Sequence, residues 1–464
     1  MDKGKLKVLL ASSEAAPFAK TGGLADVAGS LPIALEDLGV DVRVIMPKYG
    51  CIKAPGSEAV IGKDVKVYFV ENDGYFNRKE LYGDKFGDYH DNLDRFSFFS
   101  REALERCKRE GFSPDIIHCN DWQTALIPVY LNTIYKYDTF FSKTKILYTI
   151  HNLAYQGVFA KDEFPKMGLD LGLFTIEYFE FYGKINLAKA GIVYSDAVST
   201  VSPTYAQEIL TREFGCGLEG VLKNREKDLC GILNGLDYTA WDPSTDRKIF
   251  KKYSAAAPDE KYINKEALQK GLGLKIDRNT PLLGMISRLA DQKGLDLLAK
   301  IIDELLNMKV QFILLGTGDS KYHILFDKMG KVHSKNTSIN LKFDAALAQK
   351  IYAASDLFLM PSRYEPCGLG QLISFRYGAI PVARETGGLK DSVKEFSPRT
   401  KEGNGFTFSE YRADHLFAAI KRALGLFKNK TTWGELVRKV MALDFSWKKS
   451  AGEYVKLYEK MIEK

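Results

Sequence analysis

The chain has 464 residues, of which 45% are hydrophobic and 27% charged, and it carries a formal net charge of +7. This length exceeds one ordinary hydrophobic core and favours two domains of a globular protein. The small basic excess is dispersed along the chain and does not predict nucleic-acid binding, and no apolar run approaches the roughly 20 residues that cross a membrane.

The N-terminal half alternates strand and helix patterns. A buried strand is expected over residues 7–11, because this apolar run is too short for a signal peptide and Glu14 interrupts it. The helix that follows, residues 24–38, contains Pro32, which has no N–H and predicts a break near Ser30. Alternation at short spacing predicts a parallel, doubly wound sheet. Its further strands are expected over residues 42–45, 115–119, 145–150 and 197–201.

The second half repeats this rhythm after a polar, lysine-rich segment, residues 241–274, where we place the domain junction. The predicted fold class is therefore α/β, with two Rossmann-like doubly wound domains over residues 1–241 and 242–446 that face each other across a deep cleft. The second domain is expected to have strands over 282–286, 311–315, 357–360 and 380–383, and the chain to close with helices over 433–441 and 447–462.

Two glycine-containing loops are the most informative feature of the chain. Lys20-Thr21-Gly22-Gly23 and the segment from Glu365 to Gly370 each end a predicted strand and begin a predicted helix. Each loop therefore offers backbone N–H groups and a helix N-terminus to an anion. Because ligands of doubly wound sheets bind beyond the carboxyl ends of the strands, the two loops predict a ligand held between the domains, with a diphosphate as the natural candidate.

Cations accompany these loops. Arg288 follows one strand of the second half, Lys293 lies shortly after it beside Gly294, and Gly316 follows the next strand. An arginine fork and a flexible ammonium can neutralise a departing diphosphate without a metal, although isolated cations more often lie in solvent. The six cysteines show neither Cys-x-x-Cys nor zinc-ligand spacing, which predicts no metal centre and is typical of reduced thiols in a cytoplasmic protein.

Acidic and neutral polar side chains also follow predicted strands. Glu365 is held extended by the proline after it, and it either contacts a sugar near its anomeric carbon or simply faces the dipole of a helix. His151 either bonds a sugar hydroxyl or is structural. Asp121 either acts beside His151 or caps the helix that begins at Trp122. Asn234 follows another apolar run near the domain junction.

Ordered motifs along nearly the whole chain resemble the bacterial glycogen synthase and plant starch synthase family. They occupy residues 20–27, 118–122, 149–157, 232–237, 287–289, 292–294, 361–369 and 386–389. The resemblance implies the GT-B glycosyltransferase fold, with a last helix, 447–464, that crosses back onto the N-terminal domain. It also implies transfer of glucose from ADP-glucose to the 4-hydroxyl at the non-reducing end of an α-1,4-glucan such as glycogen, with retention of configuration and without a metal or other cofactor.

The same resemblance implies roles for individual residues. Two positions depart from the family, because Gly370 stands where many relatives carry a polar residue and Phe343 where some carry tyrosine, which bears on nucleotide preference. The implied catalytic residues are Glu365, His151, Arg288, Lys293 and Asp121. The residues implied to contact ADP-glucose are Arg288 and Lys293 together with Lys20, Gly22, Gly23, Asp26, Asn234, Gly316, Phe343, Cys367, Gly368, Leu369 and Gly370.

Several alternatives remain open from the sequence. UDP-glucose presents the same diphosphate as ADP-glucose. A glucan phosphorylase would carry pyridoxal phosphate on a lysine, a nucleotide-sugar epimerase would release free sugar, and a non-catalytic glucan-binding protein would release no ADP. For the transfer step we favour front-face attack over double displacement, because no carboxylate stands out as the nucleophile. The oligomeric state is not defined by the sequence.

Overall fold

The computed structural model describes residues 5–463, which form two α/β units. Unit 1 comprises the described residues up to Gly235 together with those from Trp447 onward, and unit 2 comprises Leu236–Ser446. Each unit is built on a mainly parallel sheet with helices in the crossovers, so the predicted α/β class with two Rossmann-like domains is confirmed. Among residues 5–463, no helix has the length and apolarity needed to cross a membrane.

The sheet of unit 1 has eight strands in the order β13-β12-β8-β7-β1-β2-β4-β3. All neighbouring strands are parallel except β3 and β4 at one edge. The central strands β7 and β8 are almost entirely buried, as expected when helices cover both faces of a parallel sheet. The strands are β1 (Lys7–Ala11), β2 (Asp41–Pro47), β3 (Glu58–Ile61), β4 (Val65–Val70), β7 (Ile116–Asn120), β8 (Lys145–Ile150), β12 (Ala197–Thr200) and β13 (Leu229–Gly231).

Helices of unit 1 fill the crossovers between these strands. A small separate sheet, β10-β11-β9, lies outside the main one and is formed by Glu180–Phe181, Lys184–Asn186 and Val158–Phe159. The helices are α1 (Gly23–Asp37), α2 (Asp73–Phe76), α3 (Asn92–Arg109), α4 (Leu126–Asn132), α5 (Leu187–Tyr194), α6 (Pro203–Glu208), α7 (Glu219–Asn224) and α16 (Trp447–Glu463).

The break predicted near Ser30 in the first helix is wrong. Helix α1 runs without interruption through Pro32. An internal proline costs about 3 kcal/mol, but Leu31 and Leu35 on either side of it are fully buried. Burial of two leucines contributes roughly 3–6 kcal/mol, which is enough to keep the helix continuous.

The C-terminal helix α16 packs in unit 1, although the chain first passes through unit 2. Ser450 Oγ donates a hydrogen bond to the carbonyl of Leu233 at 2.6 Å. Deeper in the unit, the hydroxyl of Tyr458 lies 2.8 Å from His118 Nδ1, and both side chains are buried. The helix is therefore held by specific polar contacts as well as by its apolar face.

The division between the units falls a few residues before the boundary expected after Trp241. Residues 236–241 lie in unit 2 because their contacts are there. The N–H of Leu236 donates to the carbonyl of Phe445 at 2.7 Å. The indole of Trp241 packs edge-on against Tyr352 at 5.9 Å between ring centroids. A lysine-rich composition marks the neighbourhood of a junction, but these contacts determine where it lies.

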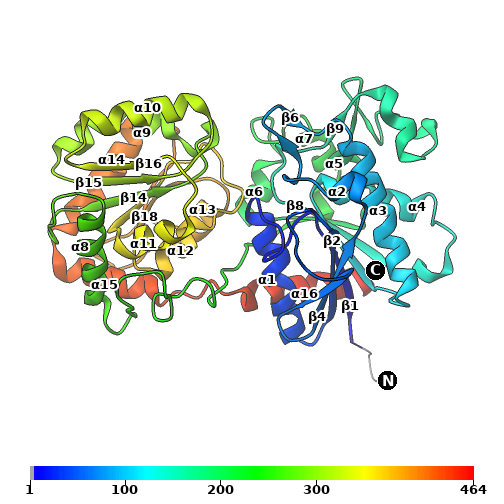
Figure 1. Cartoon of the computed structure of the whole chain (residues 1–464), viewed down its shortest axis with the longest axis horizontal. Coiled ribbons are helices and arrows are strands. Elements are labelled where there is room, and N and C mark those ends of the chain that lie inside the picture. Colours follow the sequence, from blue (N-terminus) through cyan, green and yellow to red (C-terminus); the bar gives the residue numbers. More distant parts are fainter. Residues whose placement is uncertain (1–4, 464) are drawn as a thin grey trace. The chain divides into compact units, whose positions relative to one another are not determined.

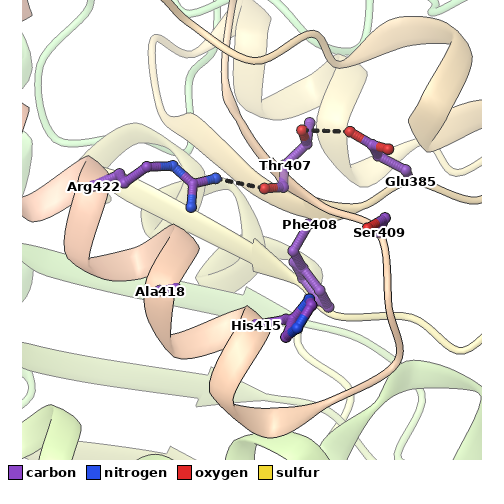
Figure 2. Close-up of a pocket in the computed structure, with 7 residues that line it drawn as sticks. All are labelled: Glu385, Thr407, Phe408, Ser409, His415, Ala418 and Arg422. Atoms are coloured by element: carbon purple, nitrogen blue, oxygen red, sulfur yellow. Dashed lines mark hydrogen bonds between the residues drawn. The ribbon is translucent and has the colours of Figure 1, made fainter.

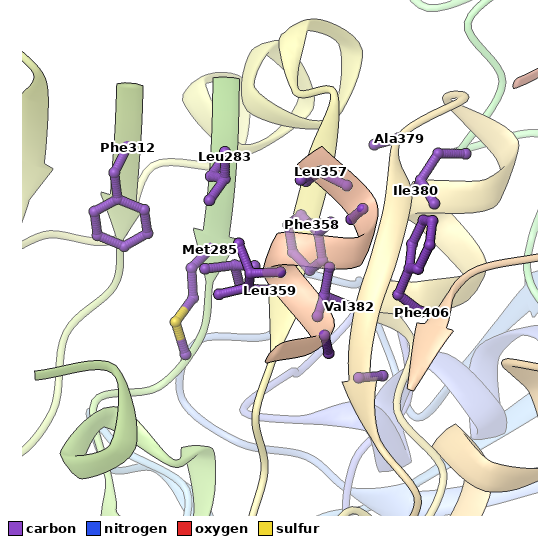
Figure 3. Packing of buried hydrophobic residues seen from close by; sticks show 14 of the residues in the cluster. Leu283, Met285, Phe312, Leu357, Phe358, Leu359, Ala379, Ile380, Val382 and Phe406 are labelled. Atoms are coloured by element: carbon purple, nitrogen blue, oxygen red, sulfur yellow. The ribbon is translucent and has the colours of Figure 1, made fainter. Parts of the chain in front are cut away.

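The sheet of unit 2 has six parallel strands in the order β16-β15-β14-β17-β18-β19. Large apolar side chains of its strands, among them Phe312, Leu359 and Phe406, belong to one buried cluster (Figure 3), and Ile313 and Leu315 of β15 belong to a second, smaller one. The strands are β14 (Leu282–Ile286), β15 (Gln311–Leu315), β16 (Thr337–Asn340), β17 (Leu357–Met360), β18 (Ile380–Arg384) and β19 (Phe406–Phe408).

Helices cover both faces of this sheet. In Figure 1, α9 and α10 lie on one side of it and α11 and α12 on the other, as right-handed crossovers require when the strand order reverses at β14. The helices of unit 2 are α8 (Lys261–Gly271), α9 (Leu295–Asn307), α10 (Ser320–Val332), α11 (Ala345–Ala354), α12 (Gly370–Arg376), α13 (Gly387–Ser392), α14 (Ala413–Phe427) and α15 (Lys430–Met441).

Candidate functional site

Each sheet has one point at which the strand order reverses. In unit 1 the chain builds β1, β2 and β4 outward in one direction and then returns to add β7, β8 and β12 on the other side of β1. In unit 2 it builds β14, β15 and β16 and then returns to add β17 beside β14. Loops at the carboxyl ends of the two central strands diverge at such a point and leave a crevice for a ligand. The predicted site residues are examined against these two switch points.

At the switch point of unit 2, an ion pair joins two predicted catalytic residues. Lys293 Nζ, in the loop after β14, lies 2.6 Å from Glu365 Oε2, in the loop after β17. The Glu365 side chain is 8% exposed and also accepts a hydrogen bond from Ser362 Oγ at 3.0 Å. A further bond from Gln292 Nε2 to the carbonyl of Tyr364 ties the same loops together. The ammonium is thus fixed in place by a buried carboxylate.

Two glycines let these loops approach closely. Gly294 has a left-handed backbone (φ +68°), and a Cβ there would lie only 1.9 Å from the carbonyl oxygen of Pro361. Gly387 (φ +44°) would likewise place a Cβ 2.0 Å from the carbonyl oxygen of Glu365. A larger residue at position 294 would push the Lys293 loop away from the Glu365 loop, and one at position 387 would push the start of α13 away from Glu365.

The Cys367–Gly370 segment lies beside this pair and leads into α12. Cys367 is buried and Gly368 has a left-handed backbone (φ +75°). A Cβ at Gly370 would lie 3.2 Å from both Met360 and Phe358. The glycine that departs from the family pattern is therefore matched to the packing beneath it. Leu369 is the residue immediately before α12.

Three other predicted residues of unit 2 occupy different surroundings. Arg288 is the second residue after the end of β14 and is exposed. Gly316 packs against the residue before Arg288, since a Cβ there would lie 2.0 Å from the carbonyl oxygen of Ser287. The ring of Phe343 is 87% exposed and follows β16, away from the switch point in the strand order. Unit 2 thus brings Lys293 and Glu365 together, with Arg288 on the same loop as Lys293 and Gly316 on the loop after the neighbouring strand β15.

In unit 1, the Lys20–Gly23 loop is organised by a residue that sequence reasoning missed. Glu14, which follows β1 and is buried, accepts hydrogen bonds from the N–H of Thr21 at 2.5 Å and of Gly22 at 3.4 Å. Its other oxygen accepts from Thr21 Oγ1 and from the hydroxyl of Tyr82. The N–H groups of Thr21 and Gly22 therefore bond a side-chain carboxylate of the protein itself, which the sequence did not predict.

Two further donor-site candidates in this loop pair with each other. Lys20 Nζ lies 2.5 Å from Asp26 Oδ1, and the Lys20 side chain is half-exposed. Gly23 is the first residue of α1 and is exposed, as is Gly22. The loop therefore presents one solvent-accessible cation beside the start of a helix.

Asp121 stands at the carboxyl end of β7 with a left-handed backbone (φ 57°). Its Oδ1 accepts a hydrogen bond from the N–H of His151 at 2.7 Å. It makes no side-chain cap for the turn at Trp122, so the alternative of a helix cap is wrong. Burial raises the pKa of Asp121 to about 7, although hydrogen bonds from the backbone of His151 and Asn152 act in the opposite direction.

The protonation of His151 follows from its partner. His151 Nε2 lies 2.8 Å from Asn120 Oδ1. Because Asn120 Nδ2 already donates to the carbonyls of Ala11 and His118, its oxygen must be the acceptor, and His151 Nε2 must carry the proton. Burial lowers the pKa of His151 to about 3, so the ring is neutral and its Nδ1 is an acceptor.

Two buried oxygens, one at a predicted site residue and one beside another, lack a partner among the described residues. They are Asn234 Oδ1 in unit 1 and Ser287 Oγ in unit 2, next to Arg288. A buried polar atom without a hydrogen bond costs roughly 1–3 kcal/mol. Both atoms are therefore candidates for contact with a bound ligand.

A separate hollow of about 320 Å³ lies between α14 and the ends of β18 and β19 (Figure 2). None of the predicted site residues lines it. Arg422 donates to the carbonyl of Thr407 at 2.7 Å, and Glu395 accepts from the N–H of Thr407 at 2.6 Å. Arg422 and Glu395 also form an ion pair at 2.8 Å, and together they satisfy the open edge of strand β19. Glu385 accepts from Thr407 Oγ1 at 2.7 Å, so Arg422 and Glu385 in the hollow both have protein partners. Within residues 5–463, no group of three or more His, Cys, Asp or Glu side chains is arranged to hold a metal.

Comparison with known proteins defines the class. The family model described as the starch synthase catalytic domain matches residues 7–224, and the model described as glycosyl transferases group 1 matches residues 272–440. The sucrose-phosphate synthase of Thermosynechococcus elongatus has the same fold (TM-score 0.65, 17% identity, 99% of this chain and 100% of that chain covered). The molecule is thus a two-domain glycosyltransferase with the GT-B fold.

Closer relatives define the family. Proteins named glycogen synthase from Geotalea daltonii and Thermosipho melanesiensis are 48% and 49% identical to this chain, and the matches cover 99% of it and 99% and 100% of those proteins. The catalytic domain of Starch Synthase IV from Arabidopsis thaliana, solved with ADP and acarbose bound, superposes with a TM-score of 0.90 at 37% identity and covers 99% of this chain and 100% of that chain. The chain belongs to the glycogen synthase family, which confirms the resemblance seen in the sequence.

Proposed function

We propose that this enzyme transfers glucose from ADP-glucose to the 4-hydroxyl at the non-reducing end of an α-1,4-glucan, with retention of configuration. The observation that carries the proposal is the Lys293–Glu365 pair at the switch point of unit 2. It places a cation and a carboxylate side by side where a nucleotide sugar would break its glycosidic bond. Similarity to a starch synthase that binds ADP and acarbose supports this donor and acceptor.

The chemical problem in this reaction is the charge on the leaving group. As the bond to the anomeric carbon breaks, negative charge grows on the diphosphate and positive charge on the sugar ring. Lys293 and Arg288 would stabilise the diphosphate, while Glu365 would face the sugar. Preorganised groups of this kind contribute about 10²–10³ in rate for each donor removed. These cations meet the developing charge directly, so we propose that neither a metal nor an organic cofactor takes part.

The groups of unit 1 fit the uncharged part of the substrates. Asp121 has a raised pKa and His151 is a neutral ring with a free acceptor nitrogen. Such groups bond sugar hydroxyls without bringing a full charge to the sugar. The buried side-chain oxygen of Asn234 would accept a hydrogen bond from a sugar hydroxyl in the same way.

We propose that transfer follows the front-face route rather than double displacement. Asp121 Oδ1 is engaged by the N–H of His151 at 2.7 Å, which lowers the nucleophilicity of this carboxylate. Glu365 is held by Lys293 and Ser362. The leaving phosphate oxygen would then accept the proton of the attacking hydroxyl. Trapping a covalent glucosyl adduct on Asp121 or Glu365 by mass spectrometry would contradict this route.

The test is a transfer assay with glycogen and either ADP-glucose or UDP-glucose. With ADP-glucose, we expect ADP release and the incorporation of one glucose into glycogen for each ADP released. With UDP-glucose, we expect a much lower rate of transfer. Preferential use of UDP-glucose would overturn the donor assignment. Free sugar without chain growth would indicate an epimerase, and a pyridoxal absorbance band in the purified protein would indicate a phosphorylase. Glycogen binding without nucleotide release would indicate a non-catalytic glucan-binding protein. Location in the cytoplasm stays a prediction from the cysteine pattern.

A further inference from the structure

Backbone strain singles out a second region of unit 1. Five non-glycine residues among residues 5–463 have a left-handed backbone. Lys309, just beyond the end of α9, and Lys401, in an exposed turn, occupy positions where this conformation is common. The other three, Asp121, Tyr182 and Cys216, all lie in unit 1. Asp121 belongs to the site already described, which raises the question of what maintains the other two.

Tyr182 occupies the tip of a tight β-hairpin. Strands β10 and β11 pair so that Phe181 faces Lys184, which leaves Tyr182 and Gly183 as the two turn residues, both left-handed (φ 50° and 77°). Turns of this kind favour asparagine followed by glycine, and a tyrosine at the first position is disfavoured. The tyrosine ring is nevertheless 81% exposed. Burial of this side chain therefore does not account for its presence there.

A second left-handed pair supports this hairpin. Cys216 (φ 50°) is followed by Gly217 (φ 84°), and a Cβ at Gly217 would lie 2.9 Å from the ring of Phe181 and 3.5 Å from that of Tyr182. The ring of Phe181 packs edge-on against Tyr182 with 4.7 Å between centroids. The Tyr182 ring thus contacts the backbone at Gly217 and the ring of Phe181, and the rest of the ring is exposed to solvent.

The hairpin is tied directly to the segment that begins with His151. Gln156, which is buried, donates through Nε2 to the carbonyl of Cys216 at 3.1 Å and accepts from Asn186 Nδ2 of β11 at 2.6 Å. The Gln156 side chain therefore connects the hairpin and the Cys216 loop to the segment that follows His151.

A second connection starts at Asp121. The residue after it, Trp122, packs edge-on against Phe159 of β9, with 5.8 Å between ring centroids. Strand β9 pairs with β11. Gly157 makes this possible, because a Cβ there would lie 2.5 Å from the Trp122 indole. The small sheet that carries Tyr182 is thus anchored to both Asp121 and His151.

We propose that Tyr182 is a binding platform for the acceptor glucan, on which the face of a pyranose ring of the chain stacks. This inference rests on the proposed function, since it requires a glucan acceptor. An exposed aromatic ring provides a flat apolar surface for the C–H groups of a sugar. Glu180 and Lys184 flank the turn, and Glu180 also accepts from the N–H of Gly183 at 2.7 Å. One exposed ring, with the partly buried Phe181 beside it and charged residues on both sides of the turn, suits a carbohydrate better than a protein interface, which requires a larger apolar patch.

The decisive variant is Tyr182→Asn. Asparagine suits the left-handed turn, so this variant removes the ring while it preserves the hairpin, and its melting temperature should equal or exceed that of the wild type. Tyr182→Phe keeps the ring. Tyr137→Asn is the matched control, because Tyr137 is 87% exposed and lies between Lys136 and Asp138, which line a hollow near the amino ends of β8 and β12.

Two readouts separate this inference from the proposed function. In native gels containing glycogen and no nucleotide sugar, Tyr182→Asn should be retarded less than the wild type, Tyr182→Phe and Tyr137→Asn. In the transfer assay its KM for glycogen should rise roughly three- to tenfold, as expected for one stacking contact, with kcat and the KM for ADP-glucose unchanged. Wild-type retardation and wild-type glycogen KM in Tyr182→Asn would overturn the platform. Absence of transfer by the wild type would overturn the proposed function, whereas the gel would still decide the role of Tyr182.

Discussion

The two switch points share a topology and differ in electrostatics. In unit 2 an ammonium and a carboxylate, Lys293 and Glu365, lie 2.6 Å apart. In unit 1 burial shifts Asp121 and His151 toward their neutral forms. The same backbone arrangement thus carries a charged centre in one unit and a nearly neutral hydroxyl-binding centre in the other. The difference indicates that the doubly wound fold supplies the position of a site, and that a few side chains decide which part of a substrate it accepts.

The largest expected effect concerns the charged centre. Lys293→Ala should lower kcat for glucose transfer by about 10²–10³, because it removes a preorganised cation from the leaving diphosphate. The melting temperature should change little. Lys331→Ala, which removes a highly exposed lysine paired with Asp327, is the matched control and should keep the wild-type rate. Near wild-type turnover in Lys293→Ala would show that unit 2 does not stabilise the leaving group in this way.

A second test concerns the carboxylate that organises the Lys20–Gly23 loop. Both carboxylate oxygens of Glu14 accept hydrogen bonds from N–H or O–H groups. Glu14→Gln replaces one of these oxygens with an NH₂ group, which can only donate hydrogen bonds. The free energy of unfolding should fall by about 2 kcal/mol, and the KM for ADP-glucose should rise. Tyr82→Phe removes only one of these bonds and should cost about 1 kcal/mol. Denaturant titrations that show equal stability for both variants would contradict the central role of Glu14.

The neutral centre can be tested through pH. The pKa of Asp121 is about 7 in the folded protein and about 3.9 when unfolded. The folded state therefore binds more protons between these values, and this group makes the protein less stable as pH rises from 4 to 7. His151, with a folded pKa of about 3, makes the protein more stable as pH rises from 3 to 6.5.

Asp121→Asn isolates the first of these effects. Asparagine has the same shape as aspartate, and its side-chain oxygen can accept the same N–H from His151. Its stability relative to the wild type should increase between pH 4 and 7, by roughly 1–2 kcal/mol once partial solvent exposure is allowed for. Urea titrations across this range provide the measurement. A difference between the two proteins that stays constant with pH would show that Asp121 ionises normally.

The smallest expected effect concerns nucleotide preference. Phe343→Ala should weaken ADP binding about fivefold, the lower part of the range for base stacking on an aromatic ring. Stability should be unchanged, because the ring is 87% exposed. UDP, with its smaller base, should lose less affinity than ADP. Equal affinities of wild type and variant in a calorimetric titration would remove Phe343 from the site.

Much of the fold could be predicted because its signals are local. Apolar runs gave the strands, and glycines after strands located the loops that meet at the switch points. The ordered motifs pointed to the charged residues of unit 2, and the structure brings Lys293 and Glu365 into contact. Residues 72 positions apart meet there because the two loops flank neighbouring strands.

The features that sequence reasoning missed depend on distant partners. Glu14 was considered only as an interruption of an apolar run, but its role depends on Thr21 and on Tyr82, which is 68 residues away. In the sequence, the signal for this role was a single carboxylate between an apolar run and a glycine-containing loop. By its position in the sequence, Asp121 resembles a helix cap. Its backbone instead directs the side chain toward the N–H of His151, which directly follows the neighbouring strand β8. The pair Tyr182-Gly183 did not indicate in the sequence that both residues form a left-handed turn.

The central claim is that the switch point of unit 2 holds the diphosphate of the donor. The most direct measurement is calorimetric titration of ADP and of adenosine into the wild type and Lys293→Ala. We expect the wild type to bind ADP far more tightly than adenosine, and we expect this difference to fall at least tenfold in Lys293→Ala while the affinity for adenosine stays constant. An undiminished preference for ADP in the variant would contradict the claim.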